Sequence, residues 1–215
     1  MVRILLADDH DVVRRGLCDM LNAQQGWEVC GEASNGLEAV KLALKVEPDV
    51  AVLDLSMPEL SGLEATRQIR RELPRTEVLI FTMHETEQLI REVLAAGARG
   101  YVLKSDAGRS LVLAIEALSH HKPFFTARVS QSLLDNYLKF PVATDESSVF
   151  HLLTDRERQI VQMLAEGKSN KEVASLLSIS VKTVETHRAT VMRKLGINSI
   201  VELVRYAIRN QLVEP

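Results

Sequence analysis

Short apolar runs and longer amphipathic stretches alternate along the first 120 residues. Runs of strand length occur at 3–7, 27–31, 50–54, 77–82 and 100–103. Between and after them, apolar residues recur with the period of a helix, in the segments 11–24, 36–46, 62–73, 86–96 and 107–119. Five strands that alternate with five helices predict an α/β domain, whose parallel sheet is covered by helices on both faces.

The pattern changes after residue 120. Residues 124–139 have one apolar helical face and are expected to form a helix, whereas 140–149 read FPVATDESSV, which is typical of a linker. Only helical patterns follow, and four helices are expected near 155–166, 170–177, 181–195 and 200–210. We therefore predict a first domain over 1–120, a linker over 121–149 that includes the helix, and an all-α domain over 150–215.

The starts and ends of these last helices are marked by specific residues. Three capping boxes are expected, at Thr154-x-x-Glu157, Ser169-x-x-Glu172 and Ser199-x-x-Glu202, and Ser180 is expected to cap a further helix. Gly167 and Gly196 stand where a helix ends in a left-handed residue.

Charge is distributed unevenly between the two predicted domains. The net charge of −3 for the whole chain combines −6 over residues 1–149 with +3 over residues 150–215. This asymmetry indicates two modules with different partners. No apolar run is long enough to cross a bilayer, and acids interrupt the N-terminal apolar stretch before it resembles a secretory signal, so a cytoplasmic location is expected.

Polar side chains follow four of the five predicted strands in the first domain. These residues are Asp8 and Asp9 after the first strand, Asp54 after the third, Thr82 at the end of the fourth, and Lys104 after the fifth. The carboxyl ends of parallel strands form the ligand crevice of an open α/β sheet, so these groups are expected to converge. Three carboxylates suit Mg²⁺, which prefers oxygen ligands. With Lys104 and Thr82 to bind a phosphoryl group, Asp54 is a candidate nucleophile that forms an aspartyl phosphate.

His10 directly follows the acidic pair. Imidazole suits Zn²⁺ better than Mg²⁺, so we expect His10 to make a local hydrogen bond rather than to bind the metal.

Residues 169–195 read as a helix, a short turn and a second helix. In a helix-turn-helix the second helix enters the major groove of DNA. Its outward face is expected to carry Lys182, Thr183, Glu185, Thr186, Ala189 and Arg193. A small packed helical domain without nucleic acid is the alternative, because a net charge of +3 is weak evidence by itself.

Several motifs resemble one protein family. These are LLADDH at 5–10, VLDLSMPELSG at 52–62, FTMHE at 81–85, GARGYVLKS at 97–105, and the whole stretch 153–197. Together they resemble the response regulators of bacterial two-component signalling, in the NarL/FixJ (LuxR-type) subfamily, over essentially the whole chain. The resemblance implies a five-stranded (βα)₅ receiver domain and an all-α, four-helix LuxR-type helix-turn-helix domain.

The resemblance also implies roles for single residues. Asp54 matches the phosphoacceptor, Thr82 and Tyr101 the switch residues, and Lys104 the phosphate-pairing lysine. Mg²⁺ would be held in the acidic pocket of Asp8, Asp9 and Asp54, with the backbone carbonyl of Ser56. In the second domain, base-edge contacts would come from about Glu185, Thr186 and Ala189, and phosphate contacts from Lys182, Thr183 and nearby basic residues such as Arg193.

The expected function is that of a transcriptional regulator rather than an enzyme. A sensor histidine kinase would phosphorylate Asp54, and this would control homodimerisation and binding to promoter DNA, which is expected to contain an inverted repeat. One alternative is a phosphatase that turns over through an aspartyl phosphate, but Ser56 stands where such enzymes usually have a second acid. The other is a DNA-binding regulator that works without phosphorylation.

Overall fold

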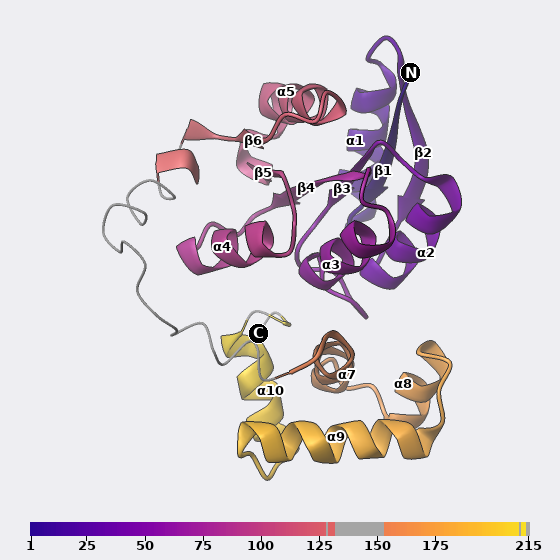
Figure 1. The fold of residues 1–215 in the computed structure, drawn as a ribbon, viewed down its shortest axis with the longest axis vertical. Helices are drawn as coiled ribbons and strands as arrows, with labels where there is room; N and C mark the ends of the chain where they lie inside the picture. The colour runs from indigo at the N-terminus through magenta and orange to yellow at the C-terminus, as the bar shows by residue number, and fades with distance from the viewer. Residues whose placement is uncertain (128, 132–152, 211, 214–215) are drawn as a thin grey trace. The chain divides into compact units, whose positions relative to one another are not determined.

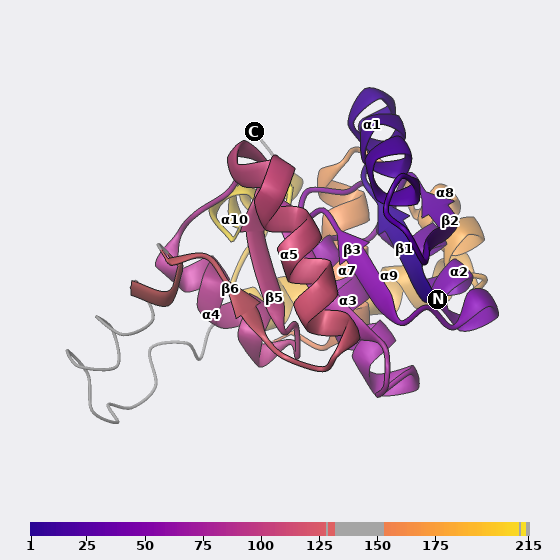
Figure 2. The ribbon, with the colours of Figure 1, turned by 90° about the horizontal axis from the view of Figure 1, so that it is seen from above.

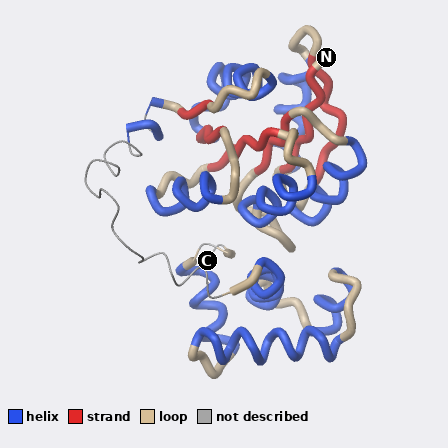
Figure 3. Tube along the Cα trace, viewed as in Figure 1, coloured by secondary structure: helices blue, strands red, loops and turns tan. Residues whose placement is uncertain are grey.

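The computed structural model describes residues 1–127, 129–131, 153–210 and 212–213 (Figure 1). The chain divides into two compact units, one rich in strands and one made of helices. Figure 3 distinguishes the strands of the first unit from the helices of both. Each unit is described by itself.

The first unit is built on a parallel sheet of six strands in the order β2-β1-β3-β4-β5-β6. The strands are β1 (Val2–Ala7), β2 (Trp27–Ala33), β3 (Val50–Leu53), β4 (Glu77–Thr82), β5 (Gly100–Leu103) and β6 (Phe124–Phe125). All four residues of β3 are buried, as the continuous apolar run predicts for a central strand.

The prediction of five strands was wrong, and the helix predicted over 124–139 starts later than expected, because residues 127 and 129–131 are helical whereas 124 and 125 are not. Phe124 and Phe125 form a sixth strand, which pairs with Gly100 and Tyr101 of β5. The backbone N–H of Phe124 donates to the carbonyl of Arg99 at 2.9 Å. Two apolar residues are too few to show a period of two, so the pattern could not distinguish this strand from a helical start. Residues 132–139 of the predicted helix lie outside the described residues.

Helices cover both faces of this sheet. They are α1 (Asp11–Asn22), α2 (Gly36–Val46), α3 (Gly62–Glu72), α4 (Glu87–Ala95) and α5 (Ala107–Ser119), with a 3-10 helix η1 at Lys104–Asp106. Figures 1 and 2 show α1 and α5 on one face of the sheet, while α2, α3 and α4 lie on the other in Figure 1. The prediction of a doubly covered parallel sheet is confirmed.

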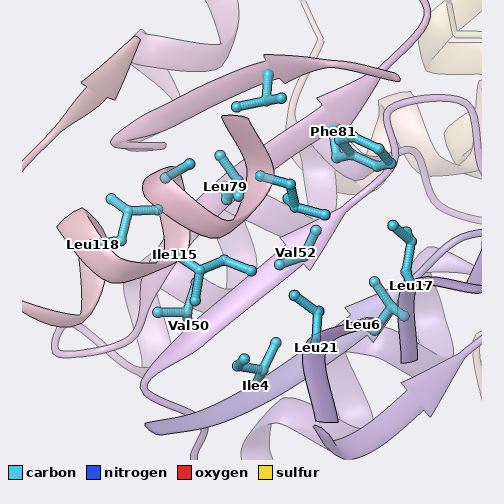
Figure 4. Packing of buried hydrophobic residues seen from close by; sticks show 13 residues of the cluster. Ile4, Leu6, Leu17, Leu21, Val50, Val52, Leu79, Phe81, Ile115 and Leu118 are labelled. Atoms are coloured by element: carbon cyan, nitrogen blue, oxygen red, sulfur yellow. The ribbon is translucent and has the colours of Figure 1, made fainter. Parts of the chain in front are cut away.

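Alternate residues of the central strands form one buried cluster with α1 and α5. Figure 4 shows this cluster, in which Leu6, Val52 and Phe81 from three strands meet side chains of the two helices, including Leu17 and Ile115. Each of these five side chains is buried. Packing of this kind holds the strands rigidly, so the loops that follow them start from fixed positions.

The second unit contains α7 (Asp155–Ala165), α8 (Asn170–Leu176), α9 (Val181–Leu195) and α10 (Ile200–Arg209). All three predicted capping boxes are formed, at the starts of α7, α8 and α10, and the Ser180 side chain accepts from Thr183 N at the start of α9. Gly196 ends α9 with a φ of 66°, in the left-handed region where a side chain would be strained. Among the described residues, no helix combines the length and the apolar character that a membrane span requires.

We expect Gly62→Ala to destabilise the first unit. A Cβ at this position would lie 1.9 Å from the backbone oxygen of Asp54, so the chain must move at the end of β3. The free energy of unfolding should fall by about 1–3 kcal/mol, the usual cost of overpacking. Denaturant titration followed by fluorescence of Trp27, the single tryptophan of the chain, reports on this unit.

Gly16→Ala is the matched control, because no atom lies within 4 Å of a Cβ built there in the middle of α1. It should raise the free energy of unfolding by about 0.5–1 kcal/mol, since alanine favours a helix. Equal stability of the two variants would contradict the close packing of α3 on the end of β3.

Candidate functional site

The pairing of β1 with β3 brings the acidic residues together. Ala7 is the register partner of Leu53, so Asp8 and Asp54, which follow them, emerge side by side at the same edge of the sheet. The backbone N–H of Asp54 donates to the carbonyl of Ala7 at 2.9 Å and continues this pairing past the strand ends. Both carboxylates are almost fully buried, with 1% of Asp8 and 4% of Asp54 exposed.

The next two strands add the predicted hydroxyl and ammonium groups. Thr82 ends β4 opposite Leu103 of β5, and Lys104 follows directly as the first residue of η1. Thr82 is fully buried. The Nζ of Lys104 lies 2.6 Å from Oδ2 of Asp54 and 2.8 Å from Oδ2 of Asp8. One cation therefore bridges acids that belong to two strands.

Burial and the contacts between Lys104 and the acids together set the pKa values of these groups. It raises the pKa of Asp54, although the hydrogen bond and charge of Lys104 act in the opposite direction. Burial also lowers the pKa of Lys104, but its hydrogen bonds and charge interactions with Asp54 and Asp8 outweigh that effect, and the net shift is upward. The pair holds a charged ammonium next to a carboxylate that is more basic than an ordinary aspartate, which favours nucleophilic reaction at Asp54.

Four side chains at this edge are close enough to share a metal ion. Ligand atoms of Asp8, Asp9, His10 and Asp54 all lie within 4.8 Å of one another. The carboxylates supply the oxygen ligands that Mg²⁺ prefers, so the donor set fits this ion. Asp9 is the most open of the acids, with 32% of its side chain exposed. His10 Nδ1 lies 2.7 Å from Oδ1 of Asp9, which is the local interaction expected of it.

The predicted switch residues meet at His84. The hydroxyl of Tyr101 donates to the carbonyl of His84 at 2.6 Å, and His84 N donates to Oγ1 of Thr82 at 3.3 Å. The ring Nε2 of His84 lies 2.9 Å from Oγ of Ser56, two residues after Asp54. Tyr101 is completely buried. Burial, followed by the charges of Glu85 and Asp54, raises its pKa, so the phenol remains a hydrogen-bond donor.

Two polar residues beside the pocket were missed in the sequence. His84 lies two positions after Thr82 in the FTMHE motif, but no pattern shows that its ring reaches Ser56. Arg14 donates from Nη1 to the backbone carbonyl of Asp8 at 2.7 Å. Its position one turn into α1 places it near the acidic pair, but a bond to a backbone carbonyl leaves no signal in the sequence.

In the second unit, α8 and α9 form the predicted helix-turn-helix. Val184 and Val191 are buried on the inner face of α9. All six predicted DNA-contacting residues are exposed, namely Lys182, Thr183, Glu185, Thr186, Ala189 and Arg193. The hydroxyl of Thr186 donates to the carbonyl of Lys182 at 2.9 Å, so its methyl group and the acceptor lone pairs of its oxygen are left for an outside partner.

A pocket lined by the end of α7, the turn and first residues of α8, and parts of α9 and α10 adds further cations that the sequence analysis did not include. Lys168, Lys171 and Arg188 are among the residues that line it, together with Glu185. The basic residues that line this pocket therefore come from the turn before α8, from the start of α8 and from α9.

Two known protein families match the chain. The family described as the response regulator receiver domain matches residues 4–116. The family described as bacterial regulatory proteins, luxR family, matches residues 151–207. Together they span most of the chain, and they fall on the strand-rich unit and on the helical unit respectively.

A curated relative and two solved structures agree with these matches. Oxygen regulatory protein NreC of Staphylococcus epidermidis is 40% identical over 218 residues, which cover 99% of this chain and all of the relative. A LuxR-family two-component response regulator from Aurantimonas is 36% identical, with a TM-score of 0.62 over 64% of this chain and 99% of that one. The structure of the RcsB response regulator in complex with DNA is 27% identical, with a TM-score of 0.60 over 95% of this chain and 96% of that one.

The arrangement of acids, lysine and hydroxyl at the carboxyl edge of a parallel sheet, the helix-turn-helix and these matches agree with one another. The chain belongs to the two-component response regulators, in the branch that joins a receiver domain to a LuxR-type DNA-binding domain.

Proposed function

We propose that a sensor histidine kinase phosphorylates this regulator on Asp54, and that phosphorylation controls its dimerisation and its binding to promoter DNA in the cytoplasm. The observation that carries the proposal is the bridge from Lys104 to the buried carboxylates of Asp54 and Asp8. The receiver would occupy residues 1–120, the linker 121–149 and the DNA-binding domain 150–215.

The carboxylate of Asp54 attacks the phosphorus atom of the kinase's phosphohistidine, and the P–N bond breaks as the P–O bond forms, so that the kinase's imidazole leaves. The phosphoryl group takes up the position that the Lys104 ammonium faces. Lys104 balances the charge of the phosphoryl oxygens, and the Thr82 hydroxyl donates to one of them. Mg²⁺, held by Asp8, Asp9, Asp54 and the backbone carbonyl of Ser56, would neutralise the charge that gathers there.

The phosphoryl group would remain on the chain's own aspartate until it is hydrolysed, so the regulator would not act as an enzyme on other substrates. Phosphorylation adds about −1.5 to −2 units of charge. Thr82 would move toward this charge, and its contact with His84 would connect the movement to Tyr101, whose hydroxyl is held by the same residue. A local change of this kind can bias the surface of the receiver between two states.

The second unit would bind the major groove through α9. Lys182, Thr183 and Arg193 are placed to contact phosphates, while Glu185, Thr186 and Ala189 would face base edges. Glu185 can accept a hydrogen bond from the amino group of cytosine. On α10, Ile200 and Val201 are exposed apolar side chains, and they would contribute to a homodimer that reads two half-sites of an inverted repeat.

We expect Asp54→Asn to abolish phosphorylation by a small phosphodonor such as acetyl phosphate, because an amide is not a nucleophile at this position. Gels that retard phosphoproteins measure the modified fraction. Asp19→Asn, which changes an exposed acid on α1, should be phosphorylated like the unaltered protein. Acid-labile phosphate on Asp54→Asn would show that another residue accepts the phosphoryl group.

The rate of phosphorylation should depend on pH through Asp54. Its carboxylate is the reactive form, so the rate falls as the pH drops through its pKa, and burial places this fall at a higher pH than for an ordinary aspartate. Lys104→Met removes the hydrogen bond and the positive charge that lower the pKa of Asp54. The acid limb of the pH profile should therefore move to still higher pH. Initial rates with acetyl phosphate across a pH series, at a fixed Mg²⁺ concentration well below saturation so that most of the protein is metal-free, measure the position of this limb.

Lys45→Met is the control for the loss of a lysine, because Lys45 is exposed on α2. Its profile should coincide with that of the unaltered protein. An acid limb that stays in place or moves to lower pH in Lys104→Met would contradict the assignment of Asp54 as the titrating nucleophile.

Binding to duplex DNA should weaken with salt, because cations released from phosphates favour the complex. We expect Lys182→Ala to lower the affinity for all sequences and to reduce the salt slope by about 1, whereas Glu185→Ala should alter sequence preference. Fluorescence anisotropy with the full chain and duplexes of varied sequence measures both effects. Lys41→Ala, an exposed lysine on α2, is the charge control. A salt slope equal in Lys182→Ala and Lys41→Ala would exclude Lys182 from the interface.

A further inference from the structure

Arg14 connects three segments around the acidic loop. Its Nη1 donates to the backbone carbonyl of Asp8 at 2.7 Å, and its Nη2 donates to the side chain of Asp11 at the start of α1. Its Nε lies 3.6 Å from Oε2 of Glu32 on β2. Only 13% of the Arg14 side chain is exposed, compared with 79% for the neighbouring Arg15. Arg14 is thus packed in place, while Arg15 extends into solvent.

The carbonyl that Arg14 holds belongs to the peptide group between the two acids. The orientation of this peptide group determines the direction in which the side chain of Asp9 leaves the backbone, and therefore where its carboxylate can point. The loop is fixed from the other side by His10 N, which donates to Oδ1 of Asp8 at 2.9 Å. Because the N-cap of α1 makes no side-chain hydrogen bond, the helix start relies on other contacts, and Arg14 supplies two of them.

We propose that Arg14 is a positioning residue for the metal site, because its guanidinium group fixes the Asp8–Asp9 peptide so that both carboxylates face the ion. The inference rests on the proposed function in one respect, namely that Asp9 is a metal ligand. Arg14 itself does not touch the ion. Like charges on adjacent carboxylates favour conformations in which they separate, and the bond from Arg14 to the carbonyl of Asp8 opposes such a rotation of the peptide.

A positioning role and a purely electrostatic role of Arg14 predict opposite effects of its loss on metal binding. A cation near the pocket repels Mg²⁺, so loss of Arg14 through Coulomb interactions alone would strengthen metal binding. In addition, Arg14 is already paired with Asp11 and Glu32, which reduces its field at the pocket. A positioning role therefore predicts that a variant without the guanidinium group binds the metal more weakly, whereas Coulomb repulsion alone predicts tighter binding. The sign of the change in metal affinity distinguishes the two roles.

The test compares Arg14→Gln and Arg14→Lys with Arg15→Gln in the full chain. Arg15 lies next in the sequence, and its Nη2 lies 3.6 Å from Oδ2 of Asp11, the other oxygen of that carboxylate, so its substitution removes the same charge without the bond to Asp8. Mn²⁺ serves as a probe whose free concentration is measured by electron paramagnetic resonance. The Mg²⁺-dependent rise in the free energy of unfolding, followed by Trp27 fluorescence, gives a second measure that needs no phosphorylation.

Arg14→Gln should raise the dissociation constant for both ions by about tenfold or more, the usual effect of losing a group that orients a metal ligand. Arg14→Lys should also weaken binding, because an ammonium group cannot present the parallel donors of a guanidinium fork. Arg15→Gln should bind as the unaltered protein does. Each variant is compared with and without metal, so a general loss of stability does not imitate this result, and Arg14→Lys carries the test if Arg14→Gln does not fold.

Unchanged or tighter metal binding in the Arg14 variants would overturn the inference, as would an equal loss in Arg15→Gln. Asp9→Asn in the same series tests the proposed function separately. If Asp9→Asn binds Mn²⁺ and Mg²⁺ normally, the assignment of Asp9 as a ligand fails. If Asp9→Asn loses binding while both Arg14 variants keep it, the metal site stands and the role of Arg14 alone is wrong.

Discussion

The first unit depends on one charge interaction, in which the buried carboxylates of Asp8 and Asp54 share the ammonium group of Lys104. Two carboxylates this close would repel, and their burial would make each ionised form costly. A single lysine offsets part of this cost and leaves a net negative charge at the pocket. That remaining charge is what a divalent cation can neutralise, so the same imbalance explains both the position of Lys104 and the fit to Mg²⁺.

This interaction is possible because the pairing of the strands sets the positions of the residues that take part in it. The register of β1 with β3 sets Asp8 beside Asp54, and the pairing of β4 with β5 sets Thr82 beside the residue before Lys104. The loops add only short extensions to strands that are buried on both faces. A site built on strand ends in this way has little freedom to rearrange, and the switch from Thr82 through His84 to Tyr101 lies within the same edge.

Much of this arrangement could be predicted from the sequence, because period and position carry the information. An apolar run followed by an acid locates a strand end, and capping boxes locate the starts of α7, α8 and α10. The contacts of Arg14 and His84 could not be predicted, because they depend on side-chain directions and on a backbone carbonyl, which leave no pattern along the chain. The strand at Phe124 was missed because it exists only through its pairing with β5.

The sixth strand, β6, lies beyond residue 120, so a receiver fragment that ends there lacks one strand of the sheet. β6 occupies the open side of β5, and β5 carries Tyr101. A fragment cut at residue 120 would keep the acidic pocket but expose the hydrogen-bonding groups of β5, and an unpaired edge is a template for association between molecules. The edge that carries the switch tyrosine is thus protected by the first residues of the connection toward the second unit, so self-association of a shortened receiver would report on its new edge rather than on phosphorylation.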